Sequence, residues 1–225
     1  MAAGVTVTLP KRENNIMTES EVLETLSRVG ALVTGDHIIY TSGRHGSSYV
    51  NKDALYPHTA ATSAVCAQIA QHFALSGIET VAGPTVGGVI MAQWTAHHLG
   101  VLLNQEIMAV YAEEEQTDAG KRRIFRRGYD AFVSGRLVLV VEDILTTGGS
   151  ARTVVDAVER AGGIVVGVAA LCNRGGITAE VLGAPDLYSL ARVPLESWAA
   201  ADCPLCAAGV PVNTRLGKGA LFTVR

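Results

Sequence analysis

The chain has 225 residues, 48% of them hydrophobic and 17% charged, so it can bury the core of one ordinary globular domain. Its formal net charge of −3 excludes a general electrostatic attraction to nucleic acid or to anionic lipid. With 24 glycines and only 5% aromatic residues, the composition favours an α/β protein with an aliphatic core and many tight turns.

The start of the chain is polar and irregular. We therefore predict a disordered leader over residues 1–17 and a single domain over residues 18–225. No run of the sequence reaches the roughly 18 apolar residues that span a bilayer, and the start lacks an apolar signal stretch. The four cysteines are scattered apart from one Cys-x-x-Cys. These features predict a cytoplasmic protein with no membrane partner.

The first predicted elements are a helix and a hairpin. Apolar residues recur at helical spacing over residues 19–29, with Thr18 or Ser20 as the cap and Gly30 as the stop. The stretch that follows, over residues 38–50, is polar with short extended pieces and predicts a hairpin or a pair of loops. We expect it to lie outside the main sheet, in a small hood made of residues from about 30 to 55 together with the C-terminal segment.

The rest of the chain alternates helices and strands, which predicts a mostly parallel central sheet flanked by helices. The predicted helices are 60–75, 89–98 and 151–161, and the predicted strands are 80–82, 101–103, 107–112, 137–141 and 164–171. The run over residues 136–141 is almost wholly apolar, as expected of a central strand covered on both faces. Active residues should lie at the carboxyl ends of these strands.

A charged segment interrupts this pattern over residues 113–128, where three glutamates are followed by several lysines and arginines. A loop of this length inside a domain is either a functional lid or a solvated loop. We favour a lid that excludes water from a reaction.

The most informative motif follows the central strand. Glu142 and Asp143 stand where the strand ends, and a loop of hydroxyl and glycine residues then leads into a helix. That loop comprises Thr146, Thr147, Gly148, Gly149 and Ser150. Amides and hydroxyls at a helix N-terminus can surround a phosphate, and two carboxylates can accept from sugar hydroxyls or hold a cation. The motif therefore predicts a sugar phosphate site.

A second glycine-rich turn connects the predicted strand over residues 80–82 to the predicted helix over residues 89–98. It comprises Pro84, Thr85, Val86, Gly87 and Gly88. Glycines here let backbone amides turn towards a pyrophosphate, although a plain strand-to-helix turn needs no ligand.

The motif over residues 138–150 resembles the phosphoribosyl pyrophosphate (PRPP) signature of the type I phosphoribosyltransferases, and the turn over residues 84–88 resembles their pyrophosphate loop. The resemblance implies their fold, a Mg²⁺ cofactor bound mainly through the substrate, with Glu142 and Asp143 as its candidate protein ligands, and a homodimer whose lids serve each other's sites. It implies that both acids hold the ribose hydroxyls, with Asp143 assisting the reacting centre, and that residues 146–150 hold the 5-phosphate.

Within the family the chain is most similar to the orotate phosphoribosyltransferases, over about residues 19–213. The stretch that contains Ser42, Gly43, Arg44 and Tyr49 resembles the segment that helps to build their base pocket. Arg174 stands where they present an arginine to the base, and a guanidinium suits the orotate carboxylate. The resemblance thus implies orotate as acceptor in pyrimidine nucleotide biosynthesis.

The sequence also departs from that pattern. Many orotate enzymes have lysine where Thr41 and Gly87 stand, and basic residues where this chain has its three glutamates. The lid cation could be Lys121, Arg122 or Arg123, and we assign the catalytic role to Lys121. A purine phosphoribosyltransferase and a non-catalytic regulator that binds PRPP remain alternatives, although no helix-turn-helix or basic arm for nucleic acid is visible.

Cys203 and Cys206 have half of the ligand spacing of a zinc knuckle, but no second pair lies nearby in the sequence. We interpret them as part of a structural turn, with metal binding and redox chemistry as alternatives.

Overall fold

The computed structural model describes residues 16–118, 120–193 and 196–222. Its larger elements, in chain order, are α1 (Glu19–Arg28), β1 (Leu32–Ile39), β2 (His45–Val50), α2 (Thr59–His72), β3 (Thr80–Pro84), α3 (Gly87–Leu103), β4 (Met108–Thr117), β5 (Gly120–Ile124), β6 (Leu137–Leu145), α4 (Gly149–Arg160), β7 (Ile164–Asn173), α5 (Ala179–Leu182), β8 (Leu187–Arg192), α6 (Pro204–Ala207) and α7 (Gly219–Phe222). The predicted leader, apart from residues 16 and 17, lies outside the described residues.

The main sheet has the strand order β5-β4-β3-β6-β7-β8. Every neighbouring pair is parallel except β4 and β5. β6 therefore lies in the interior of the sheet, as its apolar run predicts, and its residues from Val138 to Asp143 are all buried. The predicted α/β fold with a mostly parallel sheet is confirmed.

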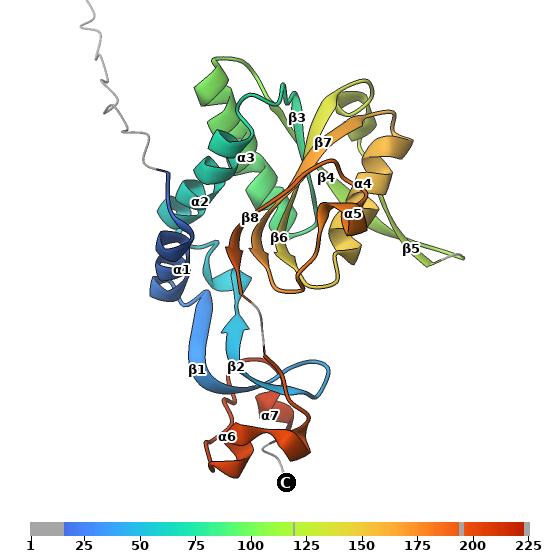
Figure 1. Cartoon of the computed structure of the whole chain (residues 1–225). Helices are drawn as coiled ribbons and strands as arrows, with labels where there is room; N and C mark the ends of the chain where they lie inside the picture. Colours follow the sequence, from blue (N-terminus) through green and yellow to red (C-terminus); the bar gives the residue numbers. More distant parts are fainter. Residues whose placement is uncertain (1–15, 119, 194–195, 223–225) are drawn as a thin grey trace, which may run out of the picture.

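Helices cover both faces of this sheet (Figure 1). α1, α2 and α3 lie on one face, and α4 and α5 lie on the other. α1 begins with a capping box, in which Thr18 and Glu21 each accept from the other's backbone N–H, so Thr18 is the cap. No helix among the described residues is long and apolar enough to cross a membrane.

A separate small layer lies below the carboxyl ends of the strands (Figure 1). It consists of the antiparallel pair β1 and β2 together with residues 196–222, and we call it the hood. Backbone hydrogen bonds join its two parts: His45 and Trp198 pair as a bridge, and the amide of Asn213 donates to the carbonyl oxygen of His37. The hood thus combines chain segments that are about 150 residues apart in sequence.

The predicted strand over residues 101–103 is wrong. These residues form the last turn of α3, and Asn104 ends the helix in the left-handed conformation while its amide donates to the carbonyl oxygen of Gly100. Val101 and Leu102 are largely exposed. Three consecutive apolar residues indicated a strand because periodicity cannot separate so short a run from a helix end.

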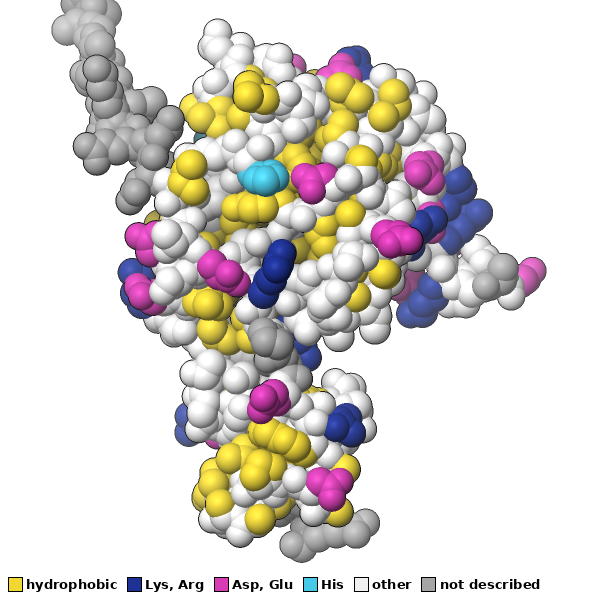
Figure 2. Space-filling view, in the orientation of Figure 1, with side chains coloured by type: hydrophobic (Ala, Val, Ile, Leu, Met, Phe, Trp, Pro, Cys, Tyr) yellow, Lys and Arg dark blue, Asp and Glu magenta, His cyan; other side chains and the backbone are white. Residues whose placement is uncertain are grey.

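The charged segment over residues 113–128 also differs from the irregular loop that we expected. Most of it extends β4 and adds β5 as an antiparallel hairpin, with Glu115 opposite Arg122 and Gln116 opposite Lys121. Figure 2 shows acidic and basic side chains next to one another in this region. Opposite charges on facing strands stabilise such a hairpin, which sequence patterns of hydrophobicity do not reveal.

Candidate active site

A cavity of about 450 Å³ lies at the carboxyl ends of β3 and β6, and residues 49–53, at the end of β2, border it as well. Nine residues that the sequence analysis selected line it: Tyr49, Pro84, Thr85, Gly87, Glu142, Asp143, Thr146, Ser150 and Arg174. The parallel strands bring these residues together, because their carboxyl ends share one edge of the sheet. Both glycine-rich loops and both acids therefore face one space.

The carboxylate of Asp143 accepts hydrogen bonds from several residues around this cavity, and Asp143 is only 3% exposed. One oxygen, Oδ2, accepts from the ammonium of Lys52 at 2.7 Å and from the hydroxyl of Tyr56 at 2.8 Å. Burial would lower the pKa of Lys52, but its hydrogen bond to Asp143 and the charge of that carboxylate outweigh this and raise it. Lys52 is therefore a cation in the site.

Sequence reasoning missed Lys52 and Tyr56 as site residues. They come from the segment between β2 and α2, to whose residues we had assigned no role in the site. Burial, followed by the charge of Asp143, raises the pKa of Tyr56, so its hydroxyl stays protonated and donates to Asp143. Only the packing of the fold, not spacing in the sequence, connects these residues to Asp143.

Glu142 is buried beside Asp143. Burial is the main cause that raises the pKa of Glu142, and the negative charge of Asp143 adds to it. Its carboxyl accepts from the amide of Asp143 at 3.0 Å. The carboxyl thus binds a proton more tightly than an exposed glutamate does, and an approaching cation or hydroxyl would favour its charged form.

This raised pKa predicts how the pH dependence of stability changes in a Glu142→Gln variant. Between the ordinary pKa of a glutamate and the raised pKa of Glu142, the folded chain keeps a proton on this carboxyl and the unfolded chain does not. The contribution of Glu142 to the free energy of unfolding therefore decreases as the pH rises towards the raised pKa. Glu142→Gln should therefore raise the Tm relative to wild type at pH 8, by about 2–4 °C for each 1 kcal/mol relieved, and the difference should shrink towards pH 5. Thermal unfolding followed by circular dichroism from pH 5 to 8 tests this; a Tm difference that is constant with pH would contradict it.

The turn between β3 and α3 packs directly against Asp143. A Cβ atom on Gly87 would overlap Oδ2 of Asp143 and the hydroxyl of Tyr56. There is no room for a Cβ atom on Gly83 or Gly88 either. Gly83 packs on the backbone of Gly88, and Gly88 packs on Gly83 and Pro84. Val86 and Gly88 belong to this turn without lining the cavity. The predicted pyrophosphate loop is therefore held against the carboxylate by glycines.

We expect a Gly87→Ala variant to lose most of its ligand affinity. The added methyl group would displace the Asp143 carboxylate from Lys52 and Tyr56, with a cost to stability of about 1–3 kcal/mol for overpacking. Titration calorimetry of phosphoribosyl pyrophosphate binding measures the loss. Gly135→Ala, just before β6 and outside the cavity lining, is the matched control because a Cβ atom added there would have no atom within 4 Å, although its positive φ adds local strain. Equal affinities for the two variants would contradict the role of Gly87.

The loop between β6 and α4 is open to a ligand. Thr146, Thr147, Gly149 and Ser150 are exposed, and Gly148 adopts a φ of 77° directly before the first turn of α4. The hydroxyl of Thr147 accepts only a long contact from the amide of Gly149, at 3.4 Å. Thr147, Gly148 and Gly149 do not line the cavity itself, but they continue the loop that Thr146 and Ser150 bring to it.

The predicted base-binding residues separate into two groups. Tyr49 and Arg174 line the cavity. Ser42, Gly43 and Arg44 lie instead in the turn between β1 and β2, where the guanidinium of Arg44 donates to the hydroxyl and the carbonyl oxygen of Ser197. Arg44 thus joins the two parts of the hood in this conformation.

Arg174 has unused hydrogen-bonding capacity. Its Nε atom is buried and has no hydrogen-bond partner among the described residues, and its guanidinium lies 5.9 Å from the centre of the Tyr40 ring. A buried, unsatisfied guanidinium N–H is costly unless a ligand accepts from it. The geometry therefore favours an anionic or carbonyl-bearing ligand beside Arg174.

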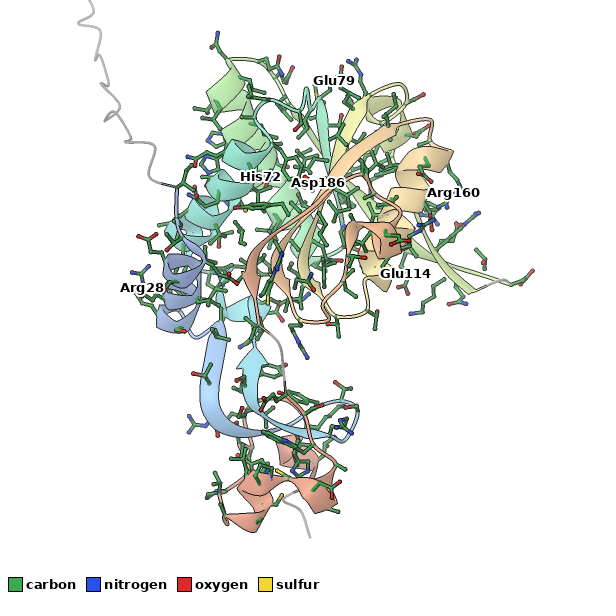
Figure 3. The ribbon with its side chains drawn as sticks, in the orientation of Figure 1. Arg28, His72, Glu79, Glu114, Arg160 and Asp186 are labelled. Atoms are coloured by element: carbon green, nitrogen blue, oxygen red, sulfur yellow. The ribbon has the colours of Figure 1, made fainter. Side chains whose placement is uncertain are left out.

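The β4–β5 hairpin contributes Arg123 to the cavity. Nη1 of Arg123 donates to the hydroxyl of Thr85 at 2.8 Å, and Arg160, labelled in Figure 3, donates to the backbone carbonyl of Arg123 at 2.7 Å. Lys121 does not line the cavity; its ammonium lies 2.7 Å from Glu114, which is also labelled in Figure 3. This conformation places Arg123, not Lys121, beside the pyrophosphate loop.

Comparison with protein families and relatives agrees with this geometry. Residues 51–187 match the family model of the phosphoribosyl transferase domain. The orotate phosphoribosyltransferase of Chlorobium phaeobacteroides is 34% identical over 197 residues, which cover 88% of this chain and 95% of that protein. The enzyme of the same name from Chlorobaculum parvum is 37% identical over the same number of residues, with the same coverage.

A solved structure shows the same fold. It is the orotate phosphoribosyltransferase of Mycobacterium tuberculosis in complex with 5-phospho-α-D-ribosyl 1-diphosphate. The two chains superpose with a TM-score of 0.58 at 28% identity, over 77% of this chain and 95% of that one.

Proposed function

The chain belongs to the type I phosphoribosyltransferase family, and from its orotate phosphoribosyltransferase relatives we infer that it transfers the phosphoribosyl group of PRPP to orotate. The products are orotidine 5′-phosphate and pyrophosphate. The observation that carries this function is a single cavity that unites two carboxylates, two glycine-rich loops and Arg174. The mycobacterial relative binds PRPP, which supports the same substrate here.

The reaction breaks the bond between the anomeric carbon and a pyrophosphate oxygen and forms a bond from that carbon to a ring nitrogen of orotate, whose N–H proton leaves. Positive charge develops on the sugar and negative charge on the leaving group. Catalysis therefore requires fixed charges and dipoles around these atoms and no protein nucleophile.

We assign the sugar phosphate to the loop after β6. Glu142 and Asp143 accept from the ribose hydroxyls, and the amides and hydroxyls of residues 146–150 hold the 5-phosphate at the N-terminus of α4. Lys52 and Tyr56 orient the Asp143 carboxylate, since both donate to the same oxygen. The positive charge of the sugar then develops beside a buried carboxylate.

We assign the pyrophosphate to the turn over residues 84–88, with Arg123 beside it. Members of this family typically use Mg²⁺, and the oxygen atoms of Glu142 and Asp143 are ligands of the kind that it prefers. Because Oδ2 of Asp143 already accepts two hydrogen bonds, most of the ion's ligands would come from the substrate. Glu142, Asp143 and the substrate would hold the ion, which would supply positive charge to the leaving group.

We assign the base to the space between Tyr49 and Arg174, where the unsatisfied Nε atom can donate to a carboxylate or a ring oxygen. Ser42, Gly43 and Arg44 would reach the base only if the hood and its turn moved towards the cavity. We also propose that the β4–β5 hairpin is the lid and that a homodimer is the active form, as the family resemblance implies.

The direct test is single-turnover consumption of PRPP with Mg²⁺, using orotate and a panel of purine and pyrimidine bases. We expect orotidine 5′-phosphate from orotate alone. Turnover of adenine, guanine or xanthine in place of orotate would identify a purine enzyme, and PRPP binding without product from any base would identify a regulator.

A further inference from the structure

Four metal-ligating side chains meet inside the hood, away from the cavity described above. His37 comes from β1 and His45 from β2, while Cys203 caps the N-terminus of α6 and Cys206 lies within that helix. One ligand atom of each lies within 4.8 Å of the ligand atom of every other. The sequence places the histidines more than 150 residues before the cysteines, so only the fold brings the second half of the ligand set to Cys-x-x-Cys.

Three of the six distances between the ligand atoms are close to those of a tetrahedral zinc site. Nε2 of His37 lies 3.6 Å from the sulfur of Cys203 and 3.6 Å from that of Cys206, and Nδ1 of His45 lies 3.3 Å from the sulfur of Cys206. Zinc bonds of standard length to sulfur and nitrogen require about 3.5 Å between such atoms in a tetrahedron. The two ring nitrogens, 2.9 Å apart, would need to separate by only about 0.4 Å.

The outer hydrogen bonds prepare His37 to bind a metal ion. Its Nδ1 atom lies 2.8 Å from the carbonyl oxygen of Val210, which can only accept, so Nδ1 carries the proton. In the neutral ring, Nε2 then carries a lone pair, which faces Nδ1 of His45 at 2.9 Å and both sulfurs at 3.6 Å. A backbone carbonyl that fixes the tautomer in this way is typical of histidines that bind zinc.

Burial supports a structural role for the site. His37, His45 and Cys203 are 1%, 7% and 2% exposed, whereas Cys206 is exposed and leaves an entry path for an ion. The described part of the hood consists of two strands and three short helical turns, and a layer of this size buries few apolar side chains. A bound ion would connect the β1–β2 pair to the C-terminal segment, in addition to the bridge between His45 and Trp198.

We propose that His37, His45, Cys203 and Cys206 form a structural Zn²⁺ site that holds the hood together. Two thiolates and two neutral imidazoles in tetrahedral positions select zinc over the oxygen-binding Mg²⁺ that serves the reaction. With four protein ligands the site is closed, so it takes no part in the transfer reaction. This site replaces the plain turn that the isolated Cys-x-x-Cys indicated.

The experiment measures metal in the full-length chain, purified without chelator, by inductively coupled plasma mass spectrometry. We expect about one zinc per chain in wild type and in the control Cys66→Ala, which removes a buried cysteine far from the hood. In Cys206→Ser, whose side chain is exposed, the content should fall below about 0.2 per chain. Circular dichroism confirms that each variant is folded.

Cobalt replacement reports the ligand geometry independently of activity. The wild-type chain loaded with Co²⁺ should show the intense visible bands of a tetrahedral site and a thiolate charge-transfer band, and both should be lost in Cys206→Ser. A folded wild-type chain that binds neither metal, or that binds both equally after Cys206→Ser, would overturn the proposal. So would a Cys203–Cys206 disulfide in the freshly purified protein.

Discussion

An Asp143→Asn variant should have a kcat/KM for PRPP about 10²–10³-fold below that of wild type. Asparagine has nearly the same shape, and its amide oxygen can still accept from Tyr56, so the fold of the site should persist. It lacks the negative charge that faces the developing positive charge on the sugar. It also leaves the Lys52 ammonium without the carboxylate that orients it.

Steady-state kinetics with varied PRPP at saturating orotate and Mg²⁺ measure this effect. Asp156→Asn is the matched control. It makes the same substitution on α4, at a partly exposed aspartate whose side chain pairs only with Arg152, at 2.9 Å, among the described residues. The control should keep the wild-type rate. If Asp143→Asn also kept most of the rate, the carboxylate would not be catalytic and the assignment of the reacting centre to β6 would fail.

The second large effect is expected from the β4–β5 hairpin. Arg123→Ala should lower kcat by about 10–10²-fold, because it removes the cation beside the turn to which we assign the leaving pyrophosphate. Arg123→Lys should restore part of the rate, since charge returns without the two-pronged geometry of a guanidinium.

The Lys121→Ala variant is the control, and it also tests the competing assignment of Lys121 as the lid cation. In this conformation its ammonium pairs with Glu114 on the hairpin surface, and removal of such an exposed pair costs little. We therefore expect a near wild-type rate. Pre-steady-state measurement of pyrophosphate release compares the two variants; a larger loss in Lys121→Ala than in Arg123→Ala would show that the hairpin rearranges and that Lys121 is the lid cation.

The proposed zinc site illustrates how a sequence pattern can be interpreted only in part. Cys-x-x-Cys alone left a turn, a metal ligand pair and a redox pair open, because a zinc site needs two further ligands and none lies nearby in sequence. The two further ligands, His37 and His45, reach the cysteines only because the β1–β2 pair packs against the C-terminal segment. No local spacing in the sequence encodes this packing.

The sequence by itself determined the class of fold, the central position of β6 and the two glycine-rich loops to which we assign the substrate. Each of these depends on neighbouring residues: an apolar run, acids at its end, and glycines before a helix. The tertiary structure alone decided that Lys52 and Tyr56 hold Asp143, that Arg123 rather than Lys121 lines the cavity, and that two histidines join two cysteines in the hood. These contacts join residues far apart along the chain, and their geometry is set by packing between elements, which periodicity and spacing do not record.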